Sequence, residues 1–154
     1  MGCGTGEPIS GYIIGRGFDL TGIDSAPAMI AIAQTRYPDA VWTVADMRAL
    51  PDVGKFHGIL SWHGFFHLSA DEQRKALPEI LSHMHAGGAI MLTVGPEAGE
   101  VTGTVAGEAV YHASLSSEEY EAILTGAGFT DVSFAPSYPA CSRSSVILAT
   151  GFAG

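Results

Sequence analysis

Three glycines at alternate positions near the start of the chain are suited to hold a ligand against bare backbone. Gly2, Gly4 and Gly6 directly precede a segment with helical periodicity. Glycines at this spacing let the chain turn tightly and let a ligand approach the main-chain N–H groups at the start of a helix. Asp24 follows at close to the spacing of about 20 residues at which a carboxylate meets the ribose hydroxyls of a nucleotide. The two features together predict a site for a nucleoside.

The position of the third glycine distinguishes between kinds of nucleotide-binding loop. A dinucleotide-binding loop needs a glycine three positions after Gly4, and Glu7 occupies this position. Binding of a nicotinamide cofactor therefore fits the pattern poorly, although a nucleotide-dependent oxidoreductase stays open as an alternative function.

Histidine and aromatic side chains follow the predicted strand 56–62, at the edge where an open α/β sheet presents its ligand contacts. A histidine with a pKa near neutrality can take a proton from a hydroxyl or ammonium group. His63 is the leading candidate for such a base, followed by His67 and His112, and a structural role stays open for each. The predicted substrate contacts are Phe65, Phe66 and Tyr111. Since no cysteine or carboxylate has zinc-site spacing beside the histidines, we expect no metal.

The charge balance excludes several kinds of partner. Lys and Arg total 7 against 16 Asp and Glu, which gives a formal charge of −9 over 154 residues. Phosphates need clustered cations, so we expect neither nucleic acid nor an anionic membrane as partner, but a small, neutral or mildly basic molecule. No apolar run reaches the roughly 18 residues of a membrane span. The two cysteines lie far apart and predict no disulfide framework, so the expected location is cytoplasmic.

Short apolar runs alternate with longer helical segments, which is typical of a parallel sheet covered by helices. We predict strands over residues 18–23, 41–44, 56–62, 89–94, 130–135 and 145–149. Helices are predicted over residues 7–16, from residue 27 with Ser25 as N-cap, from Ser69 with a kink or restart at Pro78, and after a capping box at Ser116. The glycine-punctuated segment 95–112 shows neither pattern, and we expect a loop or lid there.

The run Gly2-Cys3-Gly4-Thr5-Gly6 resembles the glycine loop of the class I S-adenosylmethionine-dependent methyltransferases. Four further segments resemble this family in the same order, namely residues 20–29, 44–51, 56–61 and 85–91. The resemblance implies a Rossmann-like α/β fold, a three-layer sandwich whose mostly parallel sheet has one antiparallel strand near its edge. It also implies methyl transfer to a small-molecule acceptor by a single methyltransferase-like domain over residues 1–154.

The resemblance further implies roles for individual residues. Gly2, Gly4 and Gly6 would face the methionine part of S-adenosylmethionine. Asp24 would accept hydrogen bonds from both ribose hydroxyls, with Ser25 beside it, and Asp46 would accept one from the adenine amino group. The other implied cofactor contacts are Met29 near the adenosine, the Met47 backbone beside the adenine ring, and Ser61 and Trp62 behind the sulfonium.

The family's first strand has no counterpart in the sequence, because it would precede Met1. That strand lies in the middle of the family's sheet, so its absence would leave two neighbouring strands with unsatisfied backbone groups, which is costly when they are buried. We expect the sequence to be part of a longer chain whose preceding residues form this strand. A non-catalytic binding domain that keeps the fold is the second alternative.

Overall fold

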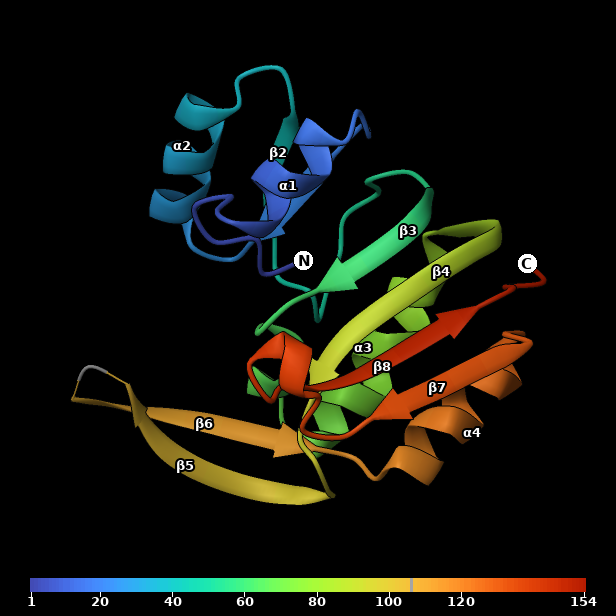
Figure 1. The fold of residues 1–154 in the computed structure, drawn as a ribbon. Coiled ribbons are helices and arrows are strands. Elements are labelled where there is room, and N and C mark those ends of the chain that lie inside the picture. The colour runs from blue at the N-terminus through green and yellow to red at the C-terminus, as the bar shows by residue number, and fades with distance from the viewer. Residues whose placement is uncertain (106) are drawn as a thin grey trace.

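Strands and helices alternate along the chain as the apolar pattern predicts. The computed structural model describes residues 1–105 and 107–154, and Figure 1 shows its strands in three sheets. The first sheet pairs β1 (Thr21–Asp24) with β2 (Val41–Val44) in parallel. The second has the order β3 (Phe56–Ser61), β4 (Met84–Val94), β8 (Ser145–Thr150) and β7 (Asp131–Ala135). The α/β class is thus confirmed, as is the antiparallel strand near the edge, because β8 runs antiparallel to both of its neighbours.

Four α-helices accompany these strands, and capping residues set the ends of two of them. They are α1 (Ile9–Gly15), α2 (Pro27–Arg36), α3 (Ala70–Ser82) and α4 (Ser117–Ala127) within the described residues. Ser69 and Glu72 form the capping box that starts α3, and the Ser116 hydroxyl accepts from the Glu119 N–H at the start of α4. Helix α4 ends at Gly128, whose left-handed φ of 111° suits a residue without a side chain.

Helices α3 and α4 lie against one face of the four-stranded sheet (Figure 1). The hydrophobic core lies between these helices and the sheet. Leu77, Leu92 and Tyr120 are fully buried there. Gln73 is buried with them, and its Nε2 donates to the carbonyls of Leu68 and Ala113, each at 2.9 Å. The Tyr120 hydroxyl donates to the other end of the same amide, at Oε1. This network fixes two carbonyls whose sequence neighbours are His67 and His112.

A gap separates the β1-β2 sheet from the four-stranded sheet. Sheets β1-β2 and β3-β4-β8-β7 are not hydrogen-bonded to each other, and a cleft of about 360 Å³ lies between β1 and β3. The first residues of the chain cross one end of it, where the Met1 nitrogen donates to the Leu60 carbonyl at 2.6 Å and the Cys3 N–H donates to the Ile23 carbonyl at 3.0 Å.

Three local predictions were wrong. Segment 95–112 contains a hairpin of β5 (Gly99–Val105) and β6 (Glu108–Ser114), with residue 106 outside the described residues. Ser25 does not cap α2, because the N-cap is Ala26, whose N–H donates to Asp24 Oδ1 at 2.9 Å. The helix does not restart at Pro78, because α3 continues through it to Ser82.

Two short 3₁₀ turns complete the described structure, at Phe65–His67 (η1) and Pro139–Cys141 (η2). η1 packs against β4 and β6. None of the described helices is long and apolar enough to cross a membrane.

Candidate functional site

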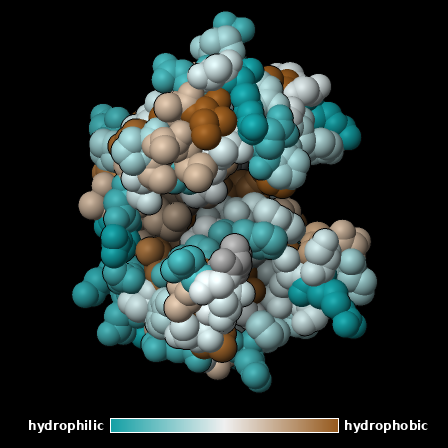
Figure 2. Space-filling model, turned by 90° about the vertical axis from the view of Figure 1, so that its left-hand side faces the viewer, coloured by the Kyte–Doolittle hydropathy of each residue, from teal (hydrophilic) through white to brown (hydrophobic). Residues whose placement is uncertain are grey.

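A second cleft, of about 370 Å³, opens where β1, β2 and β3 end. Figure 2 shows that the surface is hollowed between the upper part of the molecule, which carries α1 and α2 in Figure 1, and the lower part. The structure gathers many of the predicted site residues here, on loops that follow the three strands. The cleft is lined by Gly2, Ile23, Asp24, Ser25, Ala45, Asp46, Met47, Arg48, His63, Gly64, His67, Leu68 and Glu72.

The Asp24 carboxylate braces the glycine loop and still has acceptor capacity. Its Oδ2 accepts from the Gly4 N–H at 2.8 Å, and its Oδ1 accepts from the Ala26 N–H at 2.9 Å. An ionised carboxylate offers about two acceptor positions on each oxygen. The described residues therefore leave one position on each oxygen, which fits a pair of neighbouring hydroxyl donors such as those of a ribose.

The glycine loop owes its shape to backbone angles that side chains disfavour. Gly2, Gly4 and Gly6 have φ values of 63°, 53° and 83°. A Cβ on Gly2 would lie 3.3 Å from the Gly64 Cα across the cleft. Gly6 has a different role, since it is buried and a Cβ there would lie 3.2 Å from the Trp42 ring. The loop thus presents backbone to the cleft at Gly2 and packs against the protein at Gly6.

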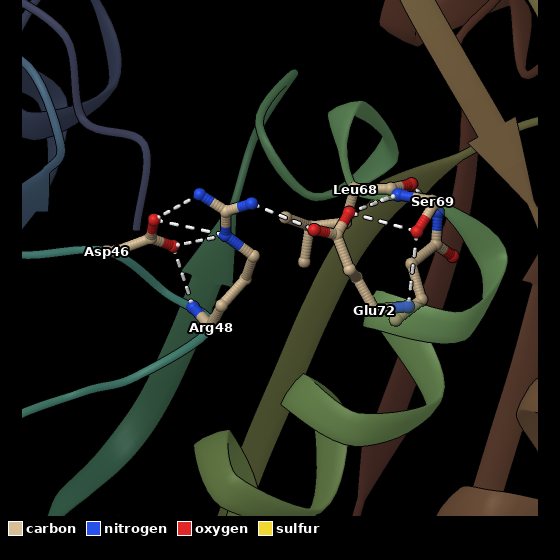
Figure 3. A network of polar contacts seen from close by, with 6 residues as sticks. Asp46, Arg48, Leu68, Ser69 and Glu72 are labelled. Atoms are coloured by element: carbon tan, nitrogen blue, oxygen red, sulfur yellow. Dashed lines mark hydrogen bonds and ion pairs between the residues drawn. The ribbon is translucent and has the colours of Figure 1, made fainter.

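An arginine bridges two carboxylates at the rim of this cleft (Figure 3). Arg48 contacts Asp46 through Nη2 at 2.5 Å and Glu72 through Nη1 at 2.8 Å. Hydrogen bonds from Arg48 are the main cause that lowers the pKa of both carboxyl groups. Both groups are therefore ionised at neutral pH, and Arg48 links the loop after β2 to the first turn of α3.

Three aromatic rings cluster beside the cleft, on η1 and β6. The Phe66 ring lies 4.7 Å from His67 and 4.8 Å from His112, and the two histidines are 4.9 Å apart, between ring centroids. His67 Nδ1 lies 3.0 Å from the Tyr111 carbonyl. A carbonyl can only accept, so Nδ1 carries the proton and Nε2 of a neutral His67 keeps its lone pair. Burial, and then the charge of His67, lower the pKa of His112.

His63 is held in an unusual backbone conformation at the end of β3. Its φ is 55°, its N–H donates to Thr93 Oγ1 at 2.7 Å, and its Nε2 lies 2.9 Å from Ser144 Oγ. Because a hydroxyl can either donate or accept, this contact does not fix which nitrogen of His63 carries the proton.

Several predicted site residues lie outside the cleft. Phe65 is fully buried and packs in the hydrophobic core, so it does not line the cleft as a substrate contact. Met29 lies 40% exposed on α2, and Trp62 lines the gap between the sheets. Ser61 Oγ is buried without a hydrogen-bond partner among the described residues. Tyr111 is half-buried on β6, and burial and Glu100 raise the pKa of its hydroxyl.

Sequence reasoning missed three contributors to the site, Arg48, Glu72 and Ser144. Arg48 stands two residues after Asp46, and Glu72 is the acidic member of the capping box, so local motifs point to both. Ser144 is 81 residues from His63, and no local pattern could reveal that contact. Over residues 1–105 and 107–154, no three His, Cys, Asp or Glu side chains gather as a metal site.

Comparison with known proteins gives a match to one protein family. The model described as a methyltransferase domain matches residues 1–88. No curated protein matches this chain.

Solved structures give the same fold. The amino pentose methyltransferase CalS10 from Micromonospora echinaspora has a TM-score of 0.74 at 20% identity, with 97% of this chain and 80% of that chain covered. An S-adenosylmethionine-dependent methyltransferase from Clostridium acetobutylicum has a TM-score of 0.76 at 12% identity, covering 99% and 82%. A TehB-like methyltransferase from Corynebacterium glutamicum has a TM-score of 0.70 at 23% identity, covering 97% and 77%.

Proposed function

Because this chain belongs to the methyltransferase domain family, we propose that it transfers a methyl group from S-adenosylmethionine to a small, neutral or mildly basic molecule at the carboxyl edge of its sheets. The family match confirms the resemblance to class I methyltransferases and, with it, an enzyme that uses S-adenosylmethionine. The observation that carries the proposed site is the Asp24 carboxylate, which lines the cleft with one acceptor position left on each oxygen.

In this proposal, different residues of the cleft contact the methionine, ribose and adenine parts of the cofactor. Gly2 offers its backbone to the methionine part, while Gly4 and Gly6 hold the loop in place around it. Asp24 accepts from the two ribose hydroxyls, beside Ser25. Asp46 and the Met47 backbone lie at the adenine end of the cleft. Met29, Ser61 and Trp62 are left out, because none of them lines this cleft.

The cofactor supplies an electrophilic methyl group on a positively charged sulfur. The protein has to orient the acceptor, exclude water and remove a proton from a hydroxyl or ammonium nucleophile. Among the three predicted histidines, the geometry favours His67 as the base, because its Nδ1–H donates to the Tyr111 carbonyl and its Nε2 is left to accept. His112 and Phe66 pack around it, and His63 lies on the same cleft.

The charge of the chain supports this acceptor class. The net charge of −9 and the carboxylates of Asp24, Asp46 and Glu72 around the cleft disfavour an anionic acceptor or nucleic acid. A cytoplasmic location goes with the proposal, since both cysteines are free thiols.

Ligand binding tests the cofactor assignment. S-adenosylmethionine and S-adenosylhomocysteine are expected to raise the Tm by mass action, whereas NAD is expected to leave it unchanged. Stabilisation by NAD alone would favour the oxidoreductase alternative, and no stabilisation by any of the three would favour a non-catalytic domain.

Turnover tests the role of His67. A panel of small amines and alcohols is assayed for formation of S-adenosylhomocysteine, and the His67→Gln variant is compared with His57→Gln, which alters an exposed histidine on β3. Loss of a general base lowers the rate by about 100-fold or more. We expect this loss for His67→Gln alone, with cofactor affinity retained. Equal rates for the two variants would remove His67 from the mechanism.

A further inference from the structure

Arg48 occupies most of the acceptor positions of the Asp46 carboxylate. Its Oδ1 accepts from the Arg48 main-chain N–H at 2.9 Å and from Nε at 3.0 Å. Its Oδ2 accepts from Nε at 3.0 Å and from Nη2 at 2.5 Å. An ionised carboxylate offers about four acceptor positions. Three N–H groups of Arg48 point at them, and the single Nε–H is shared between the two oxygens. Asp24, in the same cleft, accepts only two such bonds from the described residues.

The other side of the Arg48 guanidinium has its own anchor. Nη1 donates to Glu72 Oε1 at 2.8 Å, and the second oxygen of Glu72 accepts from the Ser69 N–H at 2.8 Å within the capping box. Figure 3 shows the guanidinium between the two carboxylates, with Asp46 on the loop after β2 and Glu72 on α3. Arg48 can therefore lose its contacts with Asp46 and still keep an ion pair with Glu72.

Because the three side chains are exposed, replacing the Arg48–Asp46 contacts costs little free energy. The side chains of Arg48, Asp46 and Glu72 are 52%, 38% and 37% exposed. Water and salt screen exposed ion pairs, which leaves them only weakly favourable. An amino group on a ligand can donate to the same carboxylate oxygens, so it can replace one of the guanidinium contacts.

We propose that Arg48 is a positioning residue of the adenine site, a latch that occupies Asp46 in the free enzyme and turns onto Glu72 when the adenine amino group takes its place. This inference rests on the proposed function, because it requires an adenosyl ligand in the cleft. Arg48 then competes with adenine for Asp46, and its removal strengthens cofactor binding. A purely structural Arg48 would act in the opposite direction, since its loss would loosen Asp46.

Calorimetric titration with S-adenosylhomocysteine tests the latch in the wild type and in the variants Arg48→Met, Glu72→Gln and the double variant. Arg74→Met is the matched control, because Arg74 also bridges two carboxylates, Asp71 and Glu119, away from the cleft. We expect Arg48→Met to bind about fivefold more tightly, the effect of one weak ion pair. Glu72→Gln is expected to bind more weakly, because the displaced guanidinium loses its second anchor, and the double variant is expected to behave as Arg48→Met. The control should match the wild type.

Two further readouts separate competition from a change in folding. S-inosylhomocysteine lacks the adenine amino donor, so Arg48→Met should give no gain in its affinity. Raising the salt concentration should tighten binding of S-adenosylhomocysteine to the wild type, as it screens the competing pair, and not to Arg48→Met. Unchanged or weaker binding of S-adenosylhomocysteine to a folded Arg48→Met variant would overturn the latch alone. Absence of binding in the wild type and in every variant would overturn the proposed function, and the latch with it.

Discussion

Replacing Asp24 with asparagine tests whether this carboxylate holds a ribose. Its two oxygens accept the N–H groups of Gly4 and Ala26 at 2.8 and 2.9 Å. Asparagine keeps one acceptor oxygen and places an NH₂ donor where the other oxygen was, so one of these backbone N–H groups then faces a donor. One of the two proposed ribose hydroxyls also loses its acceptor.

The size of the effect follows from the bonds that are lost. A hydrogen bond to a charged acceptor contributes about 1.5–3 kcal/mol, and each 1.4 kcal/mol corresponds to a factor of about ten in affinity. Losing one such bond should weaken the binding of S-adenosylhomocysteine by about 10- to 150-fold. Asp24→Ala removes both oxygens and should weaken it further.

Calorimetric titration measures the affinity, and thermal unfolding of the same samples reports the state of the glycine loop. Asp39→Asn is the control, because Asp39 is an exposed carboxylate in the turn after α2. If Asp24→Asn lowers the Tm but binds the ligand within about threefold of the wild type, less than the loss of one charged hydrogen bond, Asp24 only braces the loop and the ribose role is refuted.

Three other predictions address the loop and the histidines. Gly6→Ala should lower the Tm, because the φ of 83° at Gly6 disfavours a side chain and the new Cβ would lie 3.2 Å from Trp42. Gly15→Ala on α1 is the control and should raise the Tm, because no atom lies within 4 Å of the new Cβ. A higher Tm for both variants would contradict a strained loop. Gln73→Met should cost roughly 1–3 kcal/mol in urea unfolding, because the carbonyls of Leu68 and Ala113 lose their donor; a change near zero would show that these contacts contribute nothing net. Burial and the neighbouring His67 lower the pKa of His112 below its ordinary 6.5. As the pH drops below 6.5, the unfolded chain therefore binds the proton before the folded chain does, and the stability of the fold decreases. His112→Gln should flatten the Tm profile between pH 5 and 7, and an unchanged slope would show that other groups cause the pH dependence.

Local chemistry explains why most elements were predictable from the sequence. The capping serines at 69 and 116 start two helices because their hydroxyls accept backbone N–H groups within three residues. The hairpin β5-β6 was missed because its glycines and threonines show little apolar alternation. The two strands are held together by antiparallel backbone pairing, which the sequence pattern does not reveal. Ser25 was misjudged as a cap because Asp24, one residue earlier, already accepts the N–H of Ala26.

Sequence analysis could group the glycine loop and Asp24 in one predicted site, because their spacing is that of a nucleoside-binding motif, and the structure brings them together. It did not predict the hydrogen bond from the Gly4 N–H to Asp24 that joins them. The ion pair between Arg48 and Glu72 was not predicted, because these two residues are 24 positions apart in the sequence and only the fold brings them together. The same holds for the choice among histidines, since only the Tyr111 carbonyl, 44 residues from His67, fixes its tautomer.

Both halves of the molecule contribute to the proposed site, although their sheets are not hydrogen-bonded to each other. Asp24 and Asp46 come from the part that contains β1 and β2, whereas His63 and His67 follow β3. The contacts that span the two parts near the cleft include Met1 with Leu60 and Arg48 with Glu72. The proposed ribose acceptor Asp24 and the proposed base His67 therefore lie on different parts of the molecule, and the proposed function requires one bound cofactor and acceptor pair to contact both.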